Sequence, residues 1–293
     1  MTLAAGLPVA TAGDVDVRLG LIGDNIAPSR SPALHRLAGE LTGLRVSYDL
    51  LVPPRLGLPF EEVLLAARTE GLGGVNVTLP YKERVVALVR VADPPVARIG
   101  AVNTVRFAEG QAWGFNTDYT GFVAAFRAAF GAISPGRTVV IGTGGVGKAT
   151  AFGLLALGAP EIVLVDPDGP KAETLARSLL GAAEGRSRVA VAGLEALAAA
   201  DGVVNATPLG MVGYPGSPVP DDAFPRASWA FDAVYTPTHT SFRAQAKAAG
   251  ARFLSGWELF FHQGVEAFEI FTGRRPDPVA LRTALGDAPP PEG

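Results

Sequence analysis

The residues with the clearest chemical meaning form a glycine-rich turn near the middle of the chain. An apolar run, 138–141, leads into Gly142-Thr143-Gly144-Gly145-Val146-Gly147, and a helical pattern follows. Glycine permits the tight turn, lets the backbone approach a pyrophosphate, and packs the helix close to the strand. The N–H groups and the positive end of the helix dipole then face the phosphates. The pattern predicts a turn whose six residues bind a dinucleotide cofactor.

A carboxylate at the end of the next strand indicates which dinucleotide is bound. The apolar run 162–165 ends in Asp166, 24 residues after Gly142. An acid about 20 residues after the first glycine accepts hydrogen bonds from ribose hydroxyls, and it would repel a 2′-phosphate. The following loop, 167–171, adds Asp168 and contains no arginine, and Lys171 is its single cation. We therefore expect NAD to be preferred over NADP, although Asp166 could instead cap a turn.

Two other classes of nucleotide-binding protein share parts of this pattern. Gly142 to Lys148 also fits G-x-x-x-x-G-K, the phosphate loop of nucleoside triphosphatases. In that loop a Ser or Thr follows the lysine and binds Mg²⁺, whereas this chain has Ala149. A methyltransferase with an adenosyl cofactor shares the turn and the strand-end acid, and remains an alternative.

Polar side chains suited to a small substrate gather in the first 118 residues. Ser29 and Ser31 stand at the start of a predicted helix, where two hydroxyls and the helix dipole suit a carboxylate. N-capping by Ser31 is the structural alternative. Asn76 and Thr78 alternate along a predicted strand, so they share one face. Asn103 adds an amide at another strand end.

Lys82 and Asp118 have the chemistry for proton transfer. Pro80 is expected to begin a helix with Lys82 in its first turn, where the dipole favours the neutral amine. A neutral amine can act as a general base, and its ammonium form as a general acid. Asp118 would hold Lys82 and a substrate hydroxyl, or would N-cap the next helix. Since no serine–histidine arrangement suggests itself, nucleophilic hydrolysis is not expected.

Positioning these residues requires an α/β fold with two domains. Residues 1–118 would form an N-terminal α/β substrate-binding domain, and residues 119–256 a Rossmann-like NAD(P)-binding domain. A last helix within 257–285 would pack back onto the first domain, and 286–293 would be a tail. The chain would cross between the domains twice and leave a cleft between them.

The periodicity of apolar residues predicts the individual elements. Strands are expected at 18–22, 45–51, 73–78, 101–107, 113–116, 138–141, 161–165, 188–191, 202–206, 229–234 and 252–254. Helices are expected at 31–41, 60–70, 80–91, 118–130 and 257–271. The stripe formed by Phe122, Phe126 and Phe130 is expected to lie in the core. In the second domain, nearly continuous apolar strands favour a parallel sheet that is covered on both faces.

The composition excludes several classes of function. The net charge of −3 and the absence of a basic stripe argue against a nucleic-acid partner. No cysteine is present and the three histidines lie far apart, so we expect no metal site. No uninterrupted apolar segment of about 18 residues occurs, and residues 1–16, a predicted loose leader, contain no Lys or Arg. We expect a cytoplasmic monomer or homodimer that acts on a small molecule.

Together, these motifs resemble the shikimate dehydrogenase family. The resemblance rests on Ser-x-Ser-Pro-x-Leu-His at 29–35, Asn-Val-Thr-Leu-Pro-Tyr-Lys at 76–82, Gly-Ala-Val-Asn-Thr at 100–104 and Asn-Thr-Asp at 116–118. It continues with 205–211, 232–235 and 256–263, in the family's order, over about residues 18–285. It implies reversible hydride transfer between C3 of shikimate and a nicotinamide, in the pathway to chorismate and the aromatic amino acids.

The resemblance also implies roles for individual residues. Lys82 would be the catalytic acid/base and Asp118 its partner and a substrate ligand. Ser29, Ser31 and Tyr235 would bind the carboxylate end, and Thr78, Asn103 and Gln263 the ring hydroxyls. The residues that would line the nicotinamide side are Thr207, Pro208, Met211, Val234 and Gly256.

Departures from the family pattern leave the substrate open. Asp166-Pro167-Asp168 replaces the Asn-Arg-Thr type of loop suited to NADP and resembles the NAD-using quinate/shikimate branch. Quinate users often have Thr at the second serine position, whereas this chain has Ser31. Trp257-Glu258 replaces the expected Leu-Gly or Tyr-Gly, so an amino-substituted analogue is conceivable. The order of expectation is shikimate, quinate, then aminoshikimate; a cofactor-binding sensor without turnover is the alternative of another class.

Overall fold

The computed structural model describes Leu7 and residues 15–286 of the chain. It contains two compact units: unit 1 runs to Thr117 and resumes at Gln263, and unit 2 is Asp118–His262. Most of the predicted leader, 1–6 and 8–14, and all but Gly286 of the predicted tail lie outside the described residues. Among the helices described, none combines the length and apolar character that a membrane span requires.

Unit 1 is built on a mixed five-stranded sheet with the order β2-β1-β3-β4-β5. The strands β1, β2 and β3 are parallel, and β4 and β5 form an antiparallel hairpin beside β3. Glu109 and Gly110, both with positive φ, make the hairpin turn between β4 and β5. The strand bounds are β1 Val17–Ile22, β2 Val46–Leu51, β3 Gly74–Val77, β4 Thr104–Ala108 and β5 Gln111–Phe115.

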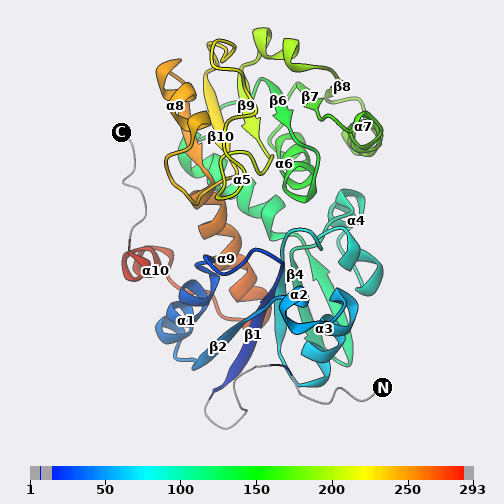
Figure 1. Ribbon diagram of the computed structural model, residues 1–293, viewed down its shortest axis with the longest axis vertical. Coiled ribbons are helices and arrows are strands. Elements are labelled where there is room, and N and C mark those ends of the chain that lie inside the picture. Colours follow the sequence, from blue (N-terminus) through cyan, green and yellow to red (C-terminus); the bar gives the residue numbers. More distant parts are fainter. Residues whose placement is uncertain (1–6, 8–14, 287–293) are drawn as a thin grey trace. The chain divides into compact units, whose positions relative to one another are not determined.

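Helices lie against this sheet and close its core. On α3, Phe60 and Val63 pack with Val75 and Val77 of β3 in one hydrophobic cluster. Figure 1 shows α10 beside α1, and the two helices are in contact. The helix bounds are α1 Ser31–Thr42, α2 Pro53–Leu56, α3 Phe60–Thr69, α4 Pro94–Ile99 and α10 Pro278–Leu285. The chain leaves unit 1 as α5 (Thr117–Phe130) begins and returns within α9 (Gly256–Thr272).

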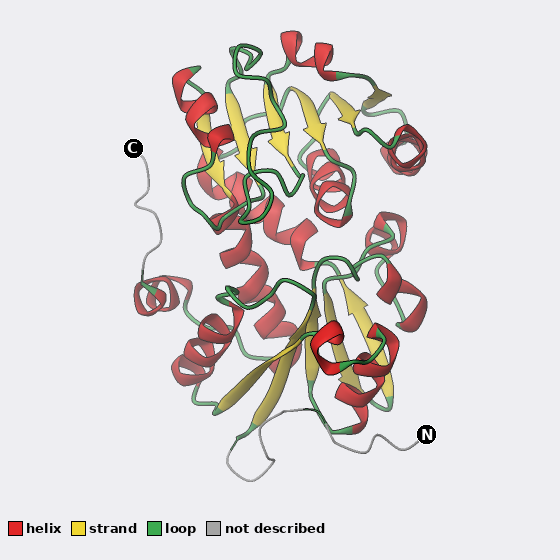
Figure 2. Ribbon diagram, viewed as in Figure 1, coloured by secondary structure: helices red, strands yellow, loops and turns green. Residues whose placement is uncertain are grey.

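Unit 2 contains a six-stranded sheet with the order β11-β10-β9-β6-β7-β8, and every pairing in it is parallel. Figure 2 shows the arrowheads of these strands at one edge of the sheet. This is the Rossmann-like arrangement predicted from the apolar runs. The strand bounds are β6 Arg137–Ile141, β7 Glu161–Val165, β8 Arg188–Val191, β9 Gly202–Asn205, β10 Trp229–Asp232 and β11 Arg252–Ser255. The remaining helical elements are α6 Gly145–Ala156, α7 Gly169–Ala183, η2 Leu194–Ala199 and α8 Ser241–Ala248.

The aromatic stripe of α5 lies in the core of unit 2, as predicted. Phe122 and Phe126 are fully buried, and their ring centroids lie 5.1 Å from Phe231 and 5.0 Å from Trp229 respectively. On α6, a Cβ at Gly153 would lie 2.6 Å from Phe122 Cδ1, so glycine is required for the approach of these two helices. The stripe serves packing rather than ligand binding.

The prediction of a helix at residues 80–91 is wrong. The structure has turns after Pro80 and one short 3₁₀ helix, η1 (Arg84–Leu88). Backbone groups near both ends of this segment bond to other parts of the chain. The Lys82 carbonyl accepts from Val102 N–H at 2.8 Å, and Arg90 forms a β-bridge with Trp113 of β5. Lys82 is therefore not in the first turn of an α-helix, and the helix-dipole argument for its neutral amine falls away.

Candidate functional site

The glycine-rich turn has the geometry that a bound pyrophosphate requires. Gly142 has φ of +96°, and a Cβ at Gly147 would lie 2.0 Å from the Gly142 carbonyl oxygen, so both positions need glycine for the turn itself. A Cβ at Gly144, in contrast, would meet no atom of the described residues within 4 Å apart from its two chain neighbours. Gly144 is the N-cap of α6 and provides no side-chain cap. The open space and the uncapped helix start fit an approaching phosphate group.

Asp166 is fixed beside this turn as an ionised group. Its Oδ2 accepts from the Thr143 N–H and hydroxyl, both at 2.7 Å, and its Oδ1 accepts from Asp168 N–H at 2.9 Å. Partial burial raises the pKa of Asp166, but these hydrogen bonds outweigh burial and hold it below 3.8. Thr143 is fully buried, so its contribution is to hold the acid in place.

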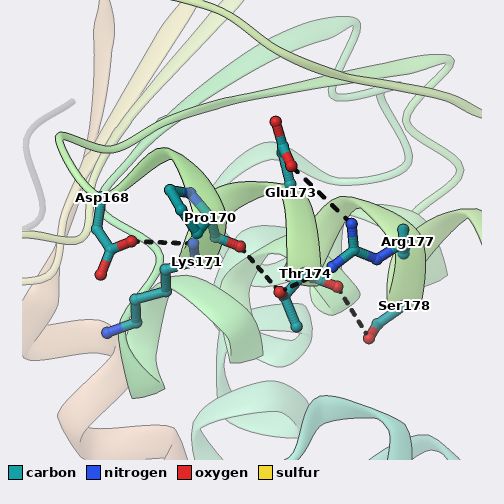
Figure 3. Close-up of polar contacts among 7 residues, drawn as sticks. All are labelled: Asp168, Pro170, Lys171, Glu173, Thr174, Arg177 and Ser178. Carbon is teal, nitrogen blue, oxygen red and sulfur yellow. Dashed lines mark hydrogen bonds and ion pairs between the residues drawn. The ribbon is translucent and has the colours of Figure 1, made fainter.

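The start of α7 determines what surrounds Asp166. Asp168 is the N-cap, and its Oδ1 accepts from Lys171 N–H at 3.1 Å (Figure 3). Further along, Arg177 faces Glu173 and donates to the Thr174 hydroxyl at 3.1 Å. The first turn of α7 is thus already capped by a carboxylate, which would repel a phosphate at this place.

The predicted nicotinamide-side residues follow β9, β10 and β11 at the edge where these parallel strands end. Thr207, Pro208 and Met211 lie in the loop after β9, and Val234 follows β10. Gly256 begins α9, and a Cβ there would lie 2.5 Å from the Ala233 carbonyl oxygen, which explains the glycine.

Tyr235 follows β10 and is anchored by aromatic packing. Its ring stacks on Phe260 of α9 with centroids 5.0 Å apart, and Trp257 packs against the same Phe260 ring at 5.2 Å. Trp257, which departs from the family pattern, is buried. Trp257 thus packs against the ring of Phe260 on which Tyr235 stacks.

Ser29 and Ser31 form a hydroxyl pair at the start of α1. The Ser29 hydroxyl donates to the Ser31 hydroxyl at 3.1 Å and accepts from Ser31 N–H at 3.2 Å. The N-cap of α1 is Arg30, so the N-capping alternative for Ser31 does not hold. The pair remains suited to a carboxylate.

A buried chain of hydroxyls and amides crosses unit 1. The Tyr48 hydroxyl donates to Asn76 Oδ1 at 2.8 Å, Asn76 Nδ2 donates to the Thr104 hydroxyl at 3.0 Å, and this hydroxyl lies 3.1 Å from that of Thr117. Asn76 Nδ2 also donates to the Asn103 carbonyl at 3.3 Å, so both of its amide hydrogens are used within the protein.

The same chain holds two predicted ligands of the ring hydroxyls. Asn103 Oδ1 accepts from Thr117 N–H at 2.7 Å, and Asn103 Nδ2 donates to the Thr117 hydroxyl at 3.0 Å. That hydroxyl also donates to Gln263 Oε1 at 3.3 Å. Thr117 therefore joins Asn103 to Gln263 within unit 1.

The segment that carries Lys82 is held on both sides. The Tyr81 hydroxyl donates to Asp24 Oδ1 at 2.5 Å, and Val102 holds the Lys82 carbonyl. Burial and the neighbouring Asp24 carboxylate raise the pKa of Tyr81 to about 12, so Tyr81 remains a neutral donor. Thr78 follows β3 and is half-buried.

Lys82 belongs to unit 1, whereas Asp118 is the first residue of unit 2. Asp118 is 6% exposed. Because α5 begins at Thr117, Asp118 lies in the first helical turn rather than at the N-cap.

Sequence reasoning missed several residues that support these groups. Thr104, Thr117 and Asp232 stand inside recognised motifs, but the sequence does not show which side chains lie next to them in the fold. Tyr48 and Thr240 lie outside the motifs.

His35 of α1 is fully buried, and its ring stacks on that of Tyr48 with centroids 4.7 Å apart. Unit 2 thus presents a glycine-rich turn suited to a pyrophosphate and the Asp166 carboxylate, which can accept hydrogen bonds from a ribose. Unit 1 presents hydroxyls, amides and one amine.

Comparison with known proteins gives consistent matches over most of the chain. Residues 21–105 match the model for the shikimate dehydrogenase substrate binding domain, and residues 256–285 match that for the shikimate 5′-dehydrogenase C-terminal domain. A quinate/shikimate dehydrogenase (NAD(+)) from Corynebacterium efficiens is 39% identical over 92% of this chain and 97% of its own. A shikimate dehydrogenase (NADP(+)) from Streptomyces avermitilis is 40% identical over 92% and 94%.

Solved structures agree with the sequence matches. Quinate dehydrogenase from Corynebacterium glutamicum in complex with NAD is 35% identical, with a TM-score of 0.83 over 92% of this chain and 98% of that one. Shikimate 5-dehydrogenase from Thermus thermophilus, in complex with NADP(H) and shikimate, is 36% identical, with a TM-score of 0.81 over the same shares.

Proposed function

Because this chain belongs to the shikimate dehydrogenase family, whose members are NAD(P)-dependent oxidoreductases, we propose that it transfers hydride reversibly between the 3-hydroxyl of shikimate and NAD, giving 3-dehydroshikimate. The observation that carries the cofactor half of this proposal is the open cradle at Gly144 beside the ionised Asp166. The substrate half rests on the family motifs at 29–35, 76–82, 100–104 and 116–118.

Lys82 and Asp118 are the proposed catalytic residues. When bound, the nicotinamide supplies the hydride acceptor. As C3 loses its hydride, the O–H bond breaks and its proton passes to the Lys82 amine; in the reverse direction the Lys82 ammonium returns it. Asp118 orients the hydroxyl and is the proposed partner of Lys82.

The other residues have binding roles in this proposal. Ser29, Ser31 and Tyr235 take the carboxylate end, and Thr78, Asn103 and Gln263 take the ring hydroxyls. Since both amide hydrogens of Asn76 are used internally, we assign Asn76 to support of Thr104 and Asn103. On the cofactor side, the proposed residues are Gly142–Gly147, Asp166, Thr207, Pro208, Met211, Val234 and Gly256.

NAD is the proposed cofactor rather than NADP. Asp166 is ionised where the ribose would bind, and Asp168 adds a second carboxylate at the start of α7. Two negative charges repel a 2′-phosphate, and Lys171 offsets only one of them. The relatives include both NAD(+) and NADP(+) enzymes, so the local charge supports this choice.

The test is an assay of four substrate and cofactor pairs. Purified protein with shikimate or quinate, and with NAD or NADP, is followed at the nicotinamide absorbance. We expect the highest kcat/KM for shikimate with NAD. Better use of quinate would change the substrate assignment, and equal or better use of NADP would overturn the cofactor assignment. If no pair gave reduction, the non-catalytic sensor would be favoured.

A further inference from the structure

A single carboxyl group is buried at the end of β10, where none of the roles above uses it. The Asp232 side chain is fully inaccessible to solvent. Its Oδ1 accepts from Asn205 Nδ2 and from Val234 N–H, both at 3.0 Å, and its Oδ2 accepts from the Thr240 hydroxyl at 2.6 Å. Three donors therefore converge on one acceptor group.

On one side, Asp232 holds the loop that follows β9. Asn205 donates to Asp232 and also to the Leu209 carbonyl at 3.1 Å. Asn205 Oδ1 in turn accepts from the Thr207 N–H at 3.0 Å and from the Thr207 hydroxyl at 2.7 Å. The shape of residues 206–211 is thus fixed through the amide that Asp232 orients.

On the other side, Asp232 holds both ends of the loop that follows β10. Val234 N–H donates to it directly, and Thr240, eight residues after Asp232, closes the loop. The Thr240 hydroxyl also accepts from Arg243 N–H at 3.1 Å and so caps α8. The two loops meet at Gly210, where a Cβ would lie 3.2 Å from Thr240 Cγ2.

The burial of a charge at this place is unfavourable by itself. Burial raises the pKa of Asp232 to about 6, because the three hydrogen bonds compensate only in part for the lost solvent. A carboxylate is acceptor-only, however, and can orient three donors at once, which no neutral side chain of the same size does.

We propose that Asp232 is a positioning residue that sets the two loops at the nicotinamide end of the dinucleotide and takes no part in holding its adenosine end. This inference rests on the proposed function, because the loops carry the proposed nicotinamide-side residues Thr207, Met211 and Val234. The adenosine end depends on Gly144 and Asp166, which make none of these hydrogen bonds.

The experiment compares two ligands on the same variants. ADP-ribose contains the adenosine and pyrophosphate, and NADH adds the nicotinamide end. In Asp232→Asn, we expect the Kd of NADH to rise by about tenfold or more, from the loss of charge-assisted hydrogen bonds, and that of ADP-ribose to stay within about twofold. Asp201→Asn is the matched control: Asp201 accepts from Arg137 N–H at 2.8 Å at the opposite edge of the same sheet, and neither Kd should change.

A second pair of variants covers the case in which Asp232→Asn fails to fold. Thr240→Val removes the hydroxyl that donates to Asp232, and Thr240→Ser keeps it. We expect Thr240→Val to raise the Kd of NADH but not that of ADP-ribose, and Thr240→Ser to bind both ligands as the unaltered protein does. Equal weakening of both ligands, or no change in NADH binding, would overturn the inference. Failure of the unaltered protein to bind ADP-ribose would instead contradict the proposed function.

Discussion

Each unit buries a cluster of polar side chains, but the two clusters differ in chemistry. In unit 1 the cluster consists of neutral hydroxyls and amides that run from Tyr48 through Asn76 to Thr117. In unit 2 the cluster surrounds one ionisable group, the carboxyl of Asp232. The first cluster keeps its hydrogen bonds over the pH range in which amides and hydroxyls do not titrate, whereas the second gains a proton on acidification.

The difference shows how hydrogen bonds fix the side chains and loops of each cluster. Neutral groups need several partners in series, and unit 1 provides them across β2, β3, β4 and α5. One charged acceptor can collect three donors, and unit 2 orders two loops with a single side chain at the expense of burying a charge. The proposed substrate and cofactor sites therefore respond differently to substitution and to pH.

The largest expected effect separates the chemistry assigned to unit 1 from the cofactor binding assigned to unit 2. Lys82→Ala removes the proposed proton carrier, so kcat should fall by a factor on the order of several hundred or more, with a smaller change in KM for shikimate. The Kd of NADH should stay unchanged. Steady-state kinetics and NADH fluorescence titration measure the three quantities.

Lys247→Ala, at an exposed position of α8, is the control and should leave both kinetics and binding unaltered. A kcat near that of the unaltered protein would remove Lys82 from the catalytic role. A parallel loss of NADH binding would contradict the separation between the units.

The next prediction concerns acid stability, where the two units should respond in opposite directions. Burial lowers the pKa of His35 to about 3, and its Nδ1 has no hydrogen-bond partner among the described residues. The folded state therefore excludes a proton that the unfolded chain binds below about 6.5. Unit 1 should therefore lose about 2 kcal/mol of stability between pH 6.5 and 5. Asp232, with its pKa raised to about 6 from 3.8, binds a proton earlier in the folded state, so unit 2 should gain about 1 kcal/mol between pH 6 and 5.

Urea unfolding at several pH values, with fluorescence and circular dichroism, measures both slopes. His35→Phe should remove the loss of stability at acid pH, whereas His239→Phe, at an exposed histidine, should not. Asp232→Asn should remove the opposing gain. An unchanged slope in His35→Phe would mean that His35 is already charged in the folded state.

The sequence predicts those parts of the molecule whose structure is determined by neighbouring residues. The strands of unit 2 and the turn at Gly142 are local features, because β-branched runs and glycines determine them within a few residues. The segment 80–91 was predicted as a helix because its pattern is helical, but the Lys82 carbonyl is taken by Val102, twenty residues away along the chain. The periodicity of a short segment cannot indicate a hydrogen bond to a residue so far along the chain.

The supporting residues of both clusters were missed for the same reason. Ser29, Lys82 and Asp118 stand in motifs, and their chemistry marks them. Thr104 matters because Asn76 lies opposite it on β3, and Asp232 because three donors from separate segments reach it. Only the three-dimensional structure brings these partners together.

The smallest predicted effect tests whether unit 2 binds its ligand through backbone, whereas unit 1 is proposed to use side chains. Gly144→Ala adds a methyl group that, chain neighbours aside, meets no described atom within 4 Å. The backbone φ there is −71°, so the melting temperature should stay equal or rise slightly. The methyl group would occupy the space proposed for the pyrophosphate, and the Kd of NADH should rise by about tenfold.

Gly147→Ala provides the opposite case within the same turn. Its new Cβ would lie 2.0 Å from the Gly142 carbonyl oxygen, so the turn must move and the melting temperature should fall together with NADH affinity. Differential scanning fluorimetry and NADH titration on both variants distinguish the two effects. Unchanged NADH affinity in Gly144→Ala would show that the pyrophosphate does not approach this backbone, and binding by side chains would then have to be sought in unit 2 as well.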